Sequence, residues 1–337
     1  MNDARPNRLS RVQRFAGPLF GLILFGIAIS FLYKKTQEIT WDQFVAGLAG
    51  IPAGFHLLAA ILVAMNYLVL TGNDMLAVRY VGASRANRDD ASAGLSYKRI
   101  LTVSFMGYAF GNNVGAVAAG VPIRIRFYKS WGLATGQVVA LIAFISLSFW
   151  IGICSTAGVA LSLVEVPTPE SLNLPVTSRI LGFLLLSILG VYVAACIWWR
   201  HPFRLAGLQL RPPGPQLMVL QIAVASFDLM LAATTLYVLL PSEIPATYPQ
   251  VVGVYLLALA AAMITQVPGG LGVLEAILLS LLATADKAAI LGSLLIFRIY
   301  YYVVPLLVAA IVLVVIEAKP SRKNRAVTID THSSEDN

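Results

Sequence analysis

The sequence of 337 residues contains few charged side chains, because Asp, Glu, Lys and Arg together make up 12% of it. Soluble domains contain about twice that share. Hydrophobic residues make up 58% of the chain, and its mean hydropathy is +0.79. These values exclude an ordinary soluble globular protein. They also exclude a disordered chain, which combines low hydrophobicity with high net charge.

Cysteine and histidine are equally scarce, with two Cys and three His residues in the chain. Cys154 and Cys196 lie in apolar runs and are interpreted as small buried hydrophobic residues rather than a disulfide. His56, His201 and His332 are far apart in the sequence, so we predict no metal site. The phosphate-binding loop, the HExxH and GxSxG motifs and the CxxC pair are all missing. We therefore predict no ATPase, no catalytic residue and no cofactor.

Long apolar runs are the feature that the sequence has in abundance. Several of them reach about 18 residues or more, the length that a helix needs to cross a bilayer. They predict an all-α fold, that of a polytopic helical membrane protein. The net charge of +8 fits this class, because Lys and Arg gather in the cytoplasmic loops of membrane proteins. We therefore predict membrane lipids as partners, and no nucleic acid.

Six uninterrupted runs are predicted to span the membrane, within one transmembrane domain that covers residues 17–316. Residues 1–16 form a basic tail and residues 317–337 a polar tail, and both are predicted to be cytoplasmic. No small-residue cleavage site follows the first run, so it is predicted to be a retained helix. The predicted spans are residues 17–33, 54–78, 134–163, 178–199, 215–240 and 288–316.

Two further apolar stretches are interrupted. Residues 100–121 are broken at Gly111-Asn112-Asn113, and residues 251–283 are broken at Pro268-Gly269-Gly270. If residues 100–121 enter and leave on the cytoplasmic side, 19 of the 24 Lys and Arg residues lie on that side. We therefore predict two re-entrant hairpins, one from each face, in the manner of an inverted repeat. Such breaks occur beside protein or a water-filled cavity, as in transporters.

Ionisable residues inside apolar spans are costly and mark candidate functional sites. Arg298 lies ten residues into the last predicted span, with Tyr301 and Tyr302 on the same helix face. Glu275 lies shortly after the second break. Arg298 and Glu275 have two interpretations, which overlap: a buried pair that locks the bundle, or the lining of a polar cavity.

Asp228 is another charged residue within a span, and Gln221 and Thr235 lie seven residues to either side of it. This spacing predicts one polar stripe along the helix, and both a structural and a functional role are open for Asp228. The second span has a polar edge, which we interpret as helix–helix hydrogen bonding. This edge consists of Asn66, Asn73 and Asp74.

The two breaks predict a site for an anion. A half-helix that begins after Pro268-Gly269-Gly270 would point free N–H groups into the membrane, and glycine permits close approach. Asn112 and Asn113 can act in the same way in the other hairpin. Arg124 and Arg126 add donors for phosphate, unless they only anchor the chain at the cytoplasmic surface. The predicted ligand is a phosphate-bearing lipid headgroup, with a soluble anion as the weaker alternative.

Three motifs carry a family resemblance. In this order, they resemble the lysylphosphatidylglycerol synthase transmembrane family, the flippase-like membrane domain of the multiple peptide resistance factor. The resemblance covers about residues 17–316. The motifs are GVPIRIRFY at residues 120–128 with WGL at residues 131–133, VPGGLGVLE at residues 267–275, and FRIYYYVVPL at residues 297–306.

The resemblance implies a bacterial inner-membrane domain that moves lipids between leaflets. In the full-length factor, a cytosolic domain transfers an amino acid to phosphatidylglycerol, and this chain is expected to lack that domain and its synthase activity. The substrate-binding residues that the resemblance implies are Arg124, Arg126, Gly269, Gly270, Glu275 and Arg298.

A translocase of a phosphate-bearing lipid is therefore the predicted function. The headgroup would enter a polar groove while the tails stay in lipid, and Glu275 would release Arg298 when the headgroup binds. Two alternatives stay open. One is an accessory subunit that does not transport and works with a partner of envelope-lipid synthesis. The other is an intramembrane lipid-modifying enzyme.

Overall fold

The computed structural model confirms an all-α polytopic membrane protein. The predicted first span and the predicted tails, except for residues 317 and 318, lie outside the described residues. The structure describes residues 51–83, 95–166, 177–199, 201, 203–205, 208–241, 244–265, 267–282 and 287–318.

Five of the predicted spans form helices that are long and apolar enough to cross a bilayer. The last of them is one continuous helix of three segments, because a π-helical turn interrupts its α-helical hydrogen bonding. The spans are α3 (Ala53–Ala83), α6 (Thr135–Leu163), α7 (Ser178–Trp198), α8 (Pro215–Leu239) and the run of α11 (Lys287–Arg298), η5 (Ile299–Val303) and α12 (Val304–Ala318).

The starts of these helices follow ordinary capping chemistry. Thr177 accepts a hydrogen bond from the Ile180 N–H at the start of α7, and the side chain of Gln137 accepts one from the Ala134 N–H before α6. Pro215 stands at the first position of α8, where its missing N–H costs nothing. Local sequence therefore sets where these spans begin.

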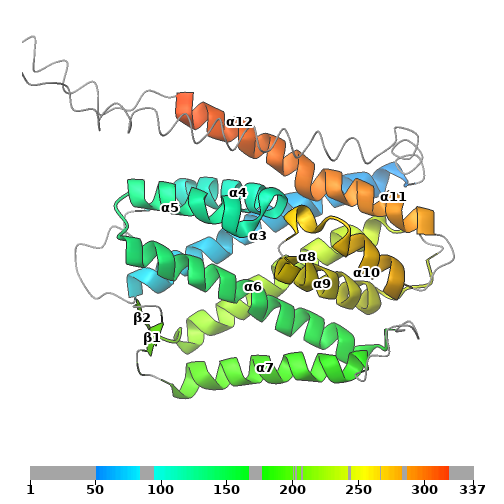
Figure 1. The fold of residues 1–337 in the computed structure, drawn as a ribbon, viewed down its shortest axis with the longest axis horizontal. Coiled ribbons are helices and arrows are strands. Elements are labelled where there is room, and N and C mark those ends of the chain that lie inside the picture. Colours follow the sequence, from blue (N-terminus) through cyan, green and yellow to red (C-terminus); the bar gives the residue numbers. More distant parts are fainter. Residues whose placement is uncertain are drawn as a thin grey trace, which may run out of the picture.

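Loop contacts show which helix ends meet. At one end, which we call the α5 end, Tyr80 of α3 donates to the Arg211 carbonyl ahead of α8. At the other end, which we call the α10 end, the side chain of Gln250 in α9 donates to the Glu165 carbonyl after α6. Figure 1 shows the spans running between these two ends, at its left and right.

The first predicted hairpin is present and longer than expected. It consists of α4 (Tyr97–Val114), the π-helical segment η2 (Ala116–Gly120) and α5 (Val121–Ser130). The predicted break at Gly111-Asn112-Asn113 is wrong, because these residues lie inside α4. The chain turns at Gly115 instead, where φ is 119°, a value that glycine adopts without strain. The returning helix therefore carries Arg124 into the bundle.

The second hairpin turns where the sequence predicted, in the proline–glycine segment. It consists of α9 (Tyr248–Thr265), the short 3-10 turn η4 (Pro268–Gly270) and α10 (Val273–Leu281). Its two helices are unequal, with 18 and 9 residues. Positive φ values at Gly269, Gly270 and Gly272 form the reversal.

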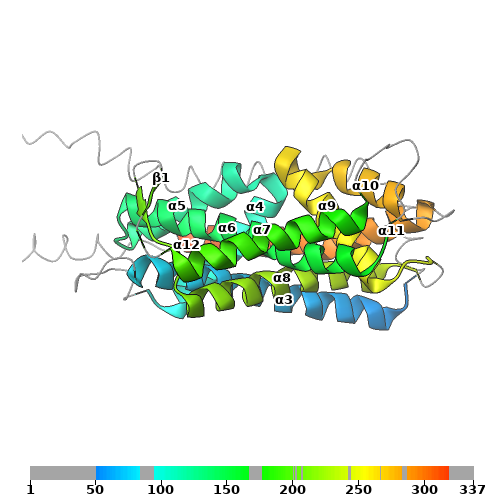
Figure 2. The ribbon, with the colours of Figure 1, turned by 90° about the horizontal axis from the view of Figure 1, so that it is seen from below.

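The two hairpins lie on the same face of the bundle. In Figure 2, α4, α5 and α10 form its upper layer, and α3 and α8 lie at the opposite side. The tip of α4 contacts η4 near the middle of the molecule. Two hairpins that enter from opposite ends therefore meet tip to tip.

A short β-hairpin joins α7 to α8 at the α5 end. Its strands β1 (Phe203–Leu205) and β2 (Leu208–Leu210) pair antiparallel. These six residues do not change the fold class, because every other described element is helical.

Candidate functional site

A cavity of about 340 Å³ lies between the tips of the two hairpins. Parts of α3, α4, α5, α6, α8 and α9, together with both turns and η5, form its wall. Seven of the predicted site residues line it: Asn112, Arg124, Asp228, Gly269, Gly270, Tyr301 and Tyr302. The other four, Asn113, Arg126, Glu275 and Arg298, are not among the lining residues.

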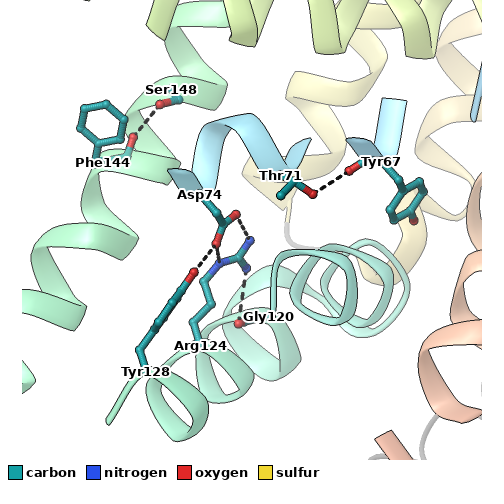
Figure 3. A network of polar contacts seen from close by, with 8 residues as sticks. All are labelled: Tyr67, Thr71, Asp74, Gly120, Arg124, Tyr128, Phe144 and Ser148. Atoms are coloured by element: carbon teal, nitrogen blue, oxygen red, sulfur yellow. Dashed lines mark hydrogen bonds and ion pairs between the residues drawn. The ribbon is translucent and has the colours of Figure 1, made fainter. Parts of the chain in front are cut away.

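Arg124 is bound on the α5 side of the cavity by a carboxylate. Its Nε and Nη2 donate to the two oxygens of Asp74 at 3.1 and 3.0 Å, as Figure 3 shows. The Tyr128 hydroxyl donates to the same carboxylate at 3.1 Å, and the guanidinium stacks on the ring of Tyr108 at 4.5 Å. Arg124 and Asp74 are both buried. Arg124 is therefore no surface anchor, and its charge is neutralised inside the bundle.

Arg298 is bound on the α10 side by Glu275, with which it forms a salt bridge. Its Nη1 and Nη2 also donate long hydrogen bonds of 3.4 Å to the carbonyls of Gly269 and Gly270. One guanidinium therefore joins the last span to the turn of the second hairpin and to α10. The structure combines features of the two interpretations of this pair. The pair holds the second hairpin against the last span, and it lies directly behind the glycine turn that lines the cavity.

The start of α10 is not the open anion site that the sequence predicted. The Glu275 carboxylate accepts a hydrogen bond of 2.9 Å from the Gly272 N–H, and so caps its own helix. It also places a negative charge at the positive end of the helix dipole. An incoming anion would have to displace this carboxylate before it could bind the Gly272 N–H.

Asp228 lies across the cavity from the hairpins, on α8. The Asn66 side-chain amide donates to its Oδ1 and to its backbone carbonyl, both at 2.7 Å. The Tyr301 hydroxyl donates to Asn66 Oδ1 at 2.9 Å. Asn66 thus forms hydrogen bonds between helices, as predicted. It also fixes the orientation of a carboxylate in the cavity wall.

The π-helical segment η5 exposes backbone carbonyls that side chains satisfy. Asn113 donates to the Tyr302 carbonyl at 3.0 Å, and the Tyr67 hydroxyl donates to the Tyr301 carbonyl at 3.3 Å. Asn113 thus supports the backbone behind the cavity rather than facing a ligand. π-Helical turns are frequent at functional sites, and this one presents Tyr301 and Tyr302 to the cavity.

Two other predicted groups lie elsewhere. Arg126 pairs with Glu317 of α12 at the α5 end, away from the cavity. The three residues of the predicted polar stripe on α8 do not share one environment. Gln221 forms hydrogen bonds with Ser148 and Tyr192 on other helices. Thr235 bonds the carbonyl of Leu231 in its own helix.

Several cavity residues were not singled out as site residues from the sequence. Tyr108, Phe149, Trp150 and Tyr255 add aromatic rings to the wall, and Asn73 adds an amide. Asn73 was predicted only as a helix-contact residue. Tyr108 and Tyr255 lie within the two interrupted segments, and this position is the signal that could have found them. Phe149 and Trp150 lie on α6, and only the packing of the helices brings them to the cavity.

Among the described lining residues, Arg124 supplies a guanidinium and Asp228 a carboxyl group. Asp74 matches the charge of Arg124, whereas the recorded partner of the Asp228 carboxylate is a neutral amide. The cavity therefore has one carboxylate that no cation in this part of the chain contacts.

Comparisons with known proteins give one family. The family model of the lysylphosphatidylglycerol synthase TM region matches residues 19–309. An uncharacterized protein of Synechocystis, slr0712, is 33% identical over 94% of this chain and 96% of its own length. The inner membrane protein YbhN of Escherichia coli K12 is 28% identical over 93% of this chain and 96% of its own length.

A phosphatidylglycerol lysyltransferase of Staphylococcus haemolyticus is 23% identical over 92% of this chain, which matches 35% of that longer protein. The comparisons and the apolar helices together identify a multi-pass inner membrane protein of lipid metabolism or transport. This chain belongs to the family of the lysylphosphatidylglycerol synthase transmembrane region.

Proposed function

We propose that the protein moves a phosphate-bearing lipid between the leaflets of the bacterial inner membrane. One observation carries the proposal, a cavity at the meeting point of two hairpins that enter from opposite ends. Broken helices at membrane depth surround substrate sites in transporters, because unwound backbone needs protein or water around it. The relatives support the proposal only in part, since one is named as a transferase that acts on phosphatidylglycerol.

The cavity has an opening that suits a lipid. Val117 at the tip of the first hairpin lines the cavity with 69% of its surface exposed, and Trp150 of α6 lines it with 39% exposed. Apolar side chains that are exposed within a membrane span face lipid. A headgroup could therefore enter the cavity here while its acyl chains stay outside the bundle.

The two buried arginines would bind the phosphate by exchanging partners. Guanidinium binds phosphate and carboxylate with the same fork geometry, so a phosphate can replace Asp74 at Arg124 or Glu275 at Arg298. The released carboxylate would free one hairpin from the neighbouring span. Binding at one pair and then at the other would carry the headgroup from the α5 end to the α10 end. We assign the α5 end to the cytoplasm, since the charge rule favours that orientation.

The test is leaflet exchange in proteoliposomes made from bacterial lipid extract with fluorescent headgroup lipids. Dithionite bleaches the outer leaflet, and the second, slower loss of fluorescence reports translocation. We expect wild-type protein to accelerate exchange over protein-free liposomes, and Arg298→Ala or Glu275→Gln to slow it at least tenfold. Arg126→Gln is the matched control, because it removes an arginine whose ion pair lies away from the cavity.

Two results would overturn the proposal. Exchange that Arg298→Ala leaves unchanged would remove the site from the mechanism. Exchange no faster than in protein-free liposomes, with several headgroups and with an imposed proton gradient, would favour an accessory subunit. The next experiment would then be isolation of a stoichiometric partner from the native membrane.

A further inference from the structure

The part of the cavity wall that α3 and α8 form contains two side chains with hydrogen-bond acceptors, Asn73 and Asp228. Asn73 of α3 lines the cavity and is 4% exposed, and its Oδ1 accepts no hydrogen bond from the described residues. Buried polar atoms in folded proteins nearly always have a partner. An unpartnered buried acceptor in a side chain that lines a cavity therefore points to a donor supplied by a ligand.

Asp228 supplies a second acceptor on the same wall. Its carboxylate lines the cavity, and the single side-chain donor recorded for it is the Asn66 amide on Oδ1. A carboxylate has about four acceptor positions, so most of its capacity is open. Asn66 precedes Asn73 by seven residues on α3, two helical turns or about 10 Å. The two acceptors therefore lie at different levels along α3.

The two buried arginines do not supply donors to these acceptors in the present structure. Asp74 holds Arg124, and Glu275 holds Arg298, which lies behind the wall. A headgroup that offers only a phosphate would meet one unmatched carboxylate and an open amide oxygen. A headgroup that also offers O–H or N–H donors would satisfy both acceptors.

We propose that Asp228 and Asn73 form an acceptor subsite that selects headgroups bearing hydrogen-bond donors, either hydroxyl or ammonium groups. Asn66 is a positioning residue in this subsite, because its amide bridges the carboxylate and the Tyr301 hydroxyl without lining the cavity. That the occupant is a lipid rests on the proposed function. The acceptor chemistry rests on the cavity alone.

The test measures equilibrium binding of short-chain lipids to the purified full chain in detergent micelles. Two matched pairs separate the sources of the donor. Phosphatidylglycerol and phosphatidylmethanol have the same charge, but only the first has free hydroxyl groups. Phosphatidylethanolamine and phosphatidylcholine are both zwitterionic, but only the first has N–H donors. We expect the donor-bearing lipid of at least one pair to bind tenfold tighter than its match.

Variants then locate the preference. Asn73→Leu keeps the side-chain size and is expected to reduce the preference for the donor-bearing lipid at least threefold. Asp228→Asn is expected to reduce the preference for phosphatidylethanolamine over phosphatidylcholine further. Ser104→Ala is the matched control. Ser104 Oγ is also buried and has no hydrogen-bond partner among the described residues, but Ser104 does not line the cavity, so its loss should leave the preference unchanged.

Two outcomes would overturn the inference: no preference in either pair, or a preference that Asn73→Leu and Asp228→Asn both leave intact. If Asp228→Asn fails to fold, Asn73→Leu decides. Binding does not require translocation, so the two proposals can fail separately. A donor preference without leaflet exchange would reject the translocase and support the acceptor subsite. Leaflet exchange without a donor preference would support the translocase and reject the acceptor subsite.

Discussion

Gly107 of α4 stands directly against the guanidinium of Arg124. A Cβ at this position would lie 2.6 Å from Arg124 Nη1, and the guanidinium would have to shift while Asp74 holds it. We expect Gly107→Ala to lower the free energy of unfolding by about 1–3 kcal/mol, as overpacking does. Thermal unfolding in detergent would measure this.

Gly190 of α7 offers the matched control for that substitution. A Cβ there has no atom within 4 Å. Alanine is the better helix former, so Gly190→Ala should be neutral or stabilising by up to about 1 kcal/mol. Equal destabilisation by both substitutions would show that Gly107 has no special contact with Arg124.

Asn113 gives a second prediction at the scale of single residues. Its amide supplies a donor to the Tyr302 carbonyl in a π-helical turn. Asn113→Leu should lower the free energy of unfolding by about 1–3 kcal/mol, because a buried carbonyl would lose its donor. Thr235→Val is the control, since this buried hydroxyl bonds only its own helix. A larger loss for Thr235→Val in the same unfolding assay would contradict the assignment.

Single residues also show where inference from the sequence reached its limit. Glu275 and Arg298 could be proposed as partners, because both are charges in apolar segments, and they do pair. Arg124 follows an apolar run, as surface anchors do, so its partner could not be found. Asp74 lies 50 residues earlier in another helix, and only packing brings the two together.

At the scale of elements, the tip of the second hairpin depends on glycine backbone geometry. Gly272 has a φ of 76°, and a Cβ added there would have no described atom within 4 Å. A Cβ added at Gly270 would lie 3.0 Å from the Cβ of Ala262. We expect Gly272→Ala to lower the free energy of unfolding by about 1–3 kcal/mol through strain alone. Gly270→Ala should lower it more, because strain and the contact add. The same unfolding assay would report the order of the two variants.

Hydropathy located both hairpins but not their internal geometry. The breaks in the apolar stretches and the positive-inside rule predicted that the chain turns back twice. They could not place the first turn at Gly115, because Gly111-Asn112-Asn113 is the more polar segment and yet stays helical. The π-helical segment η5 leaves no mark in hydropathy, because tertiary hydrogen bonds stabilise it.

For the whole molecule, re-entrant hairpins predict which positions share a face of the membrane. Single cysteines at Tyr97 and Ser130, which flank the first hairpin, should react with an impermeant maleimide from one side. Cysteines at Thr247 and Ser280, which flank the second, should react from the other. Cys154 and Cys196 are buried and would be replaced to give a clean background. Labelling of Tyr97 and Ser130 positions from opposite sides would show that the first hairpin crosses the membrane.

The pairing of the two buried arginines has an electrical consequence. Moving one elementary charge across a membrane at 100 mV involves about 2.3 kcal/mol. Each guanidinium moves against a carboxylate of opposite sign, so breaking or remaking either pair displaces little net charge through the field. The protein itself would then be nearly insensitive to membrane voltage. Any voltage dependence of leaflet exchange would report the net charge of the headgroup that is carried.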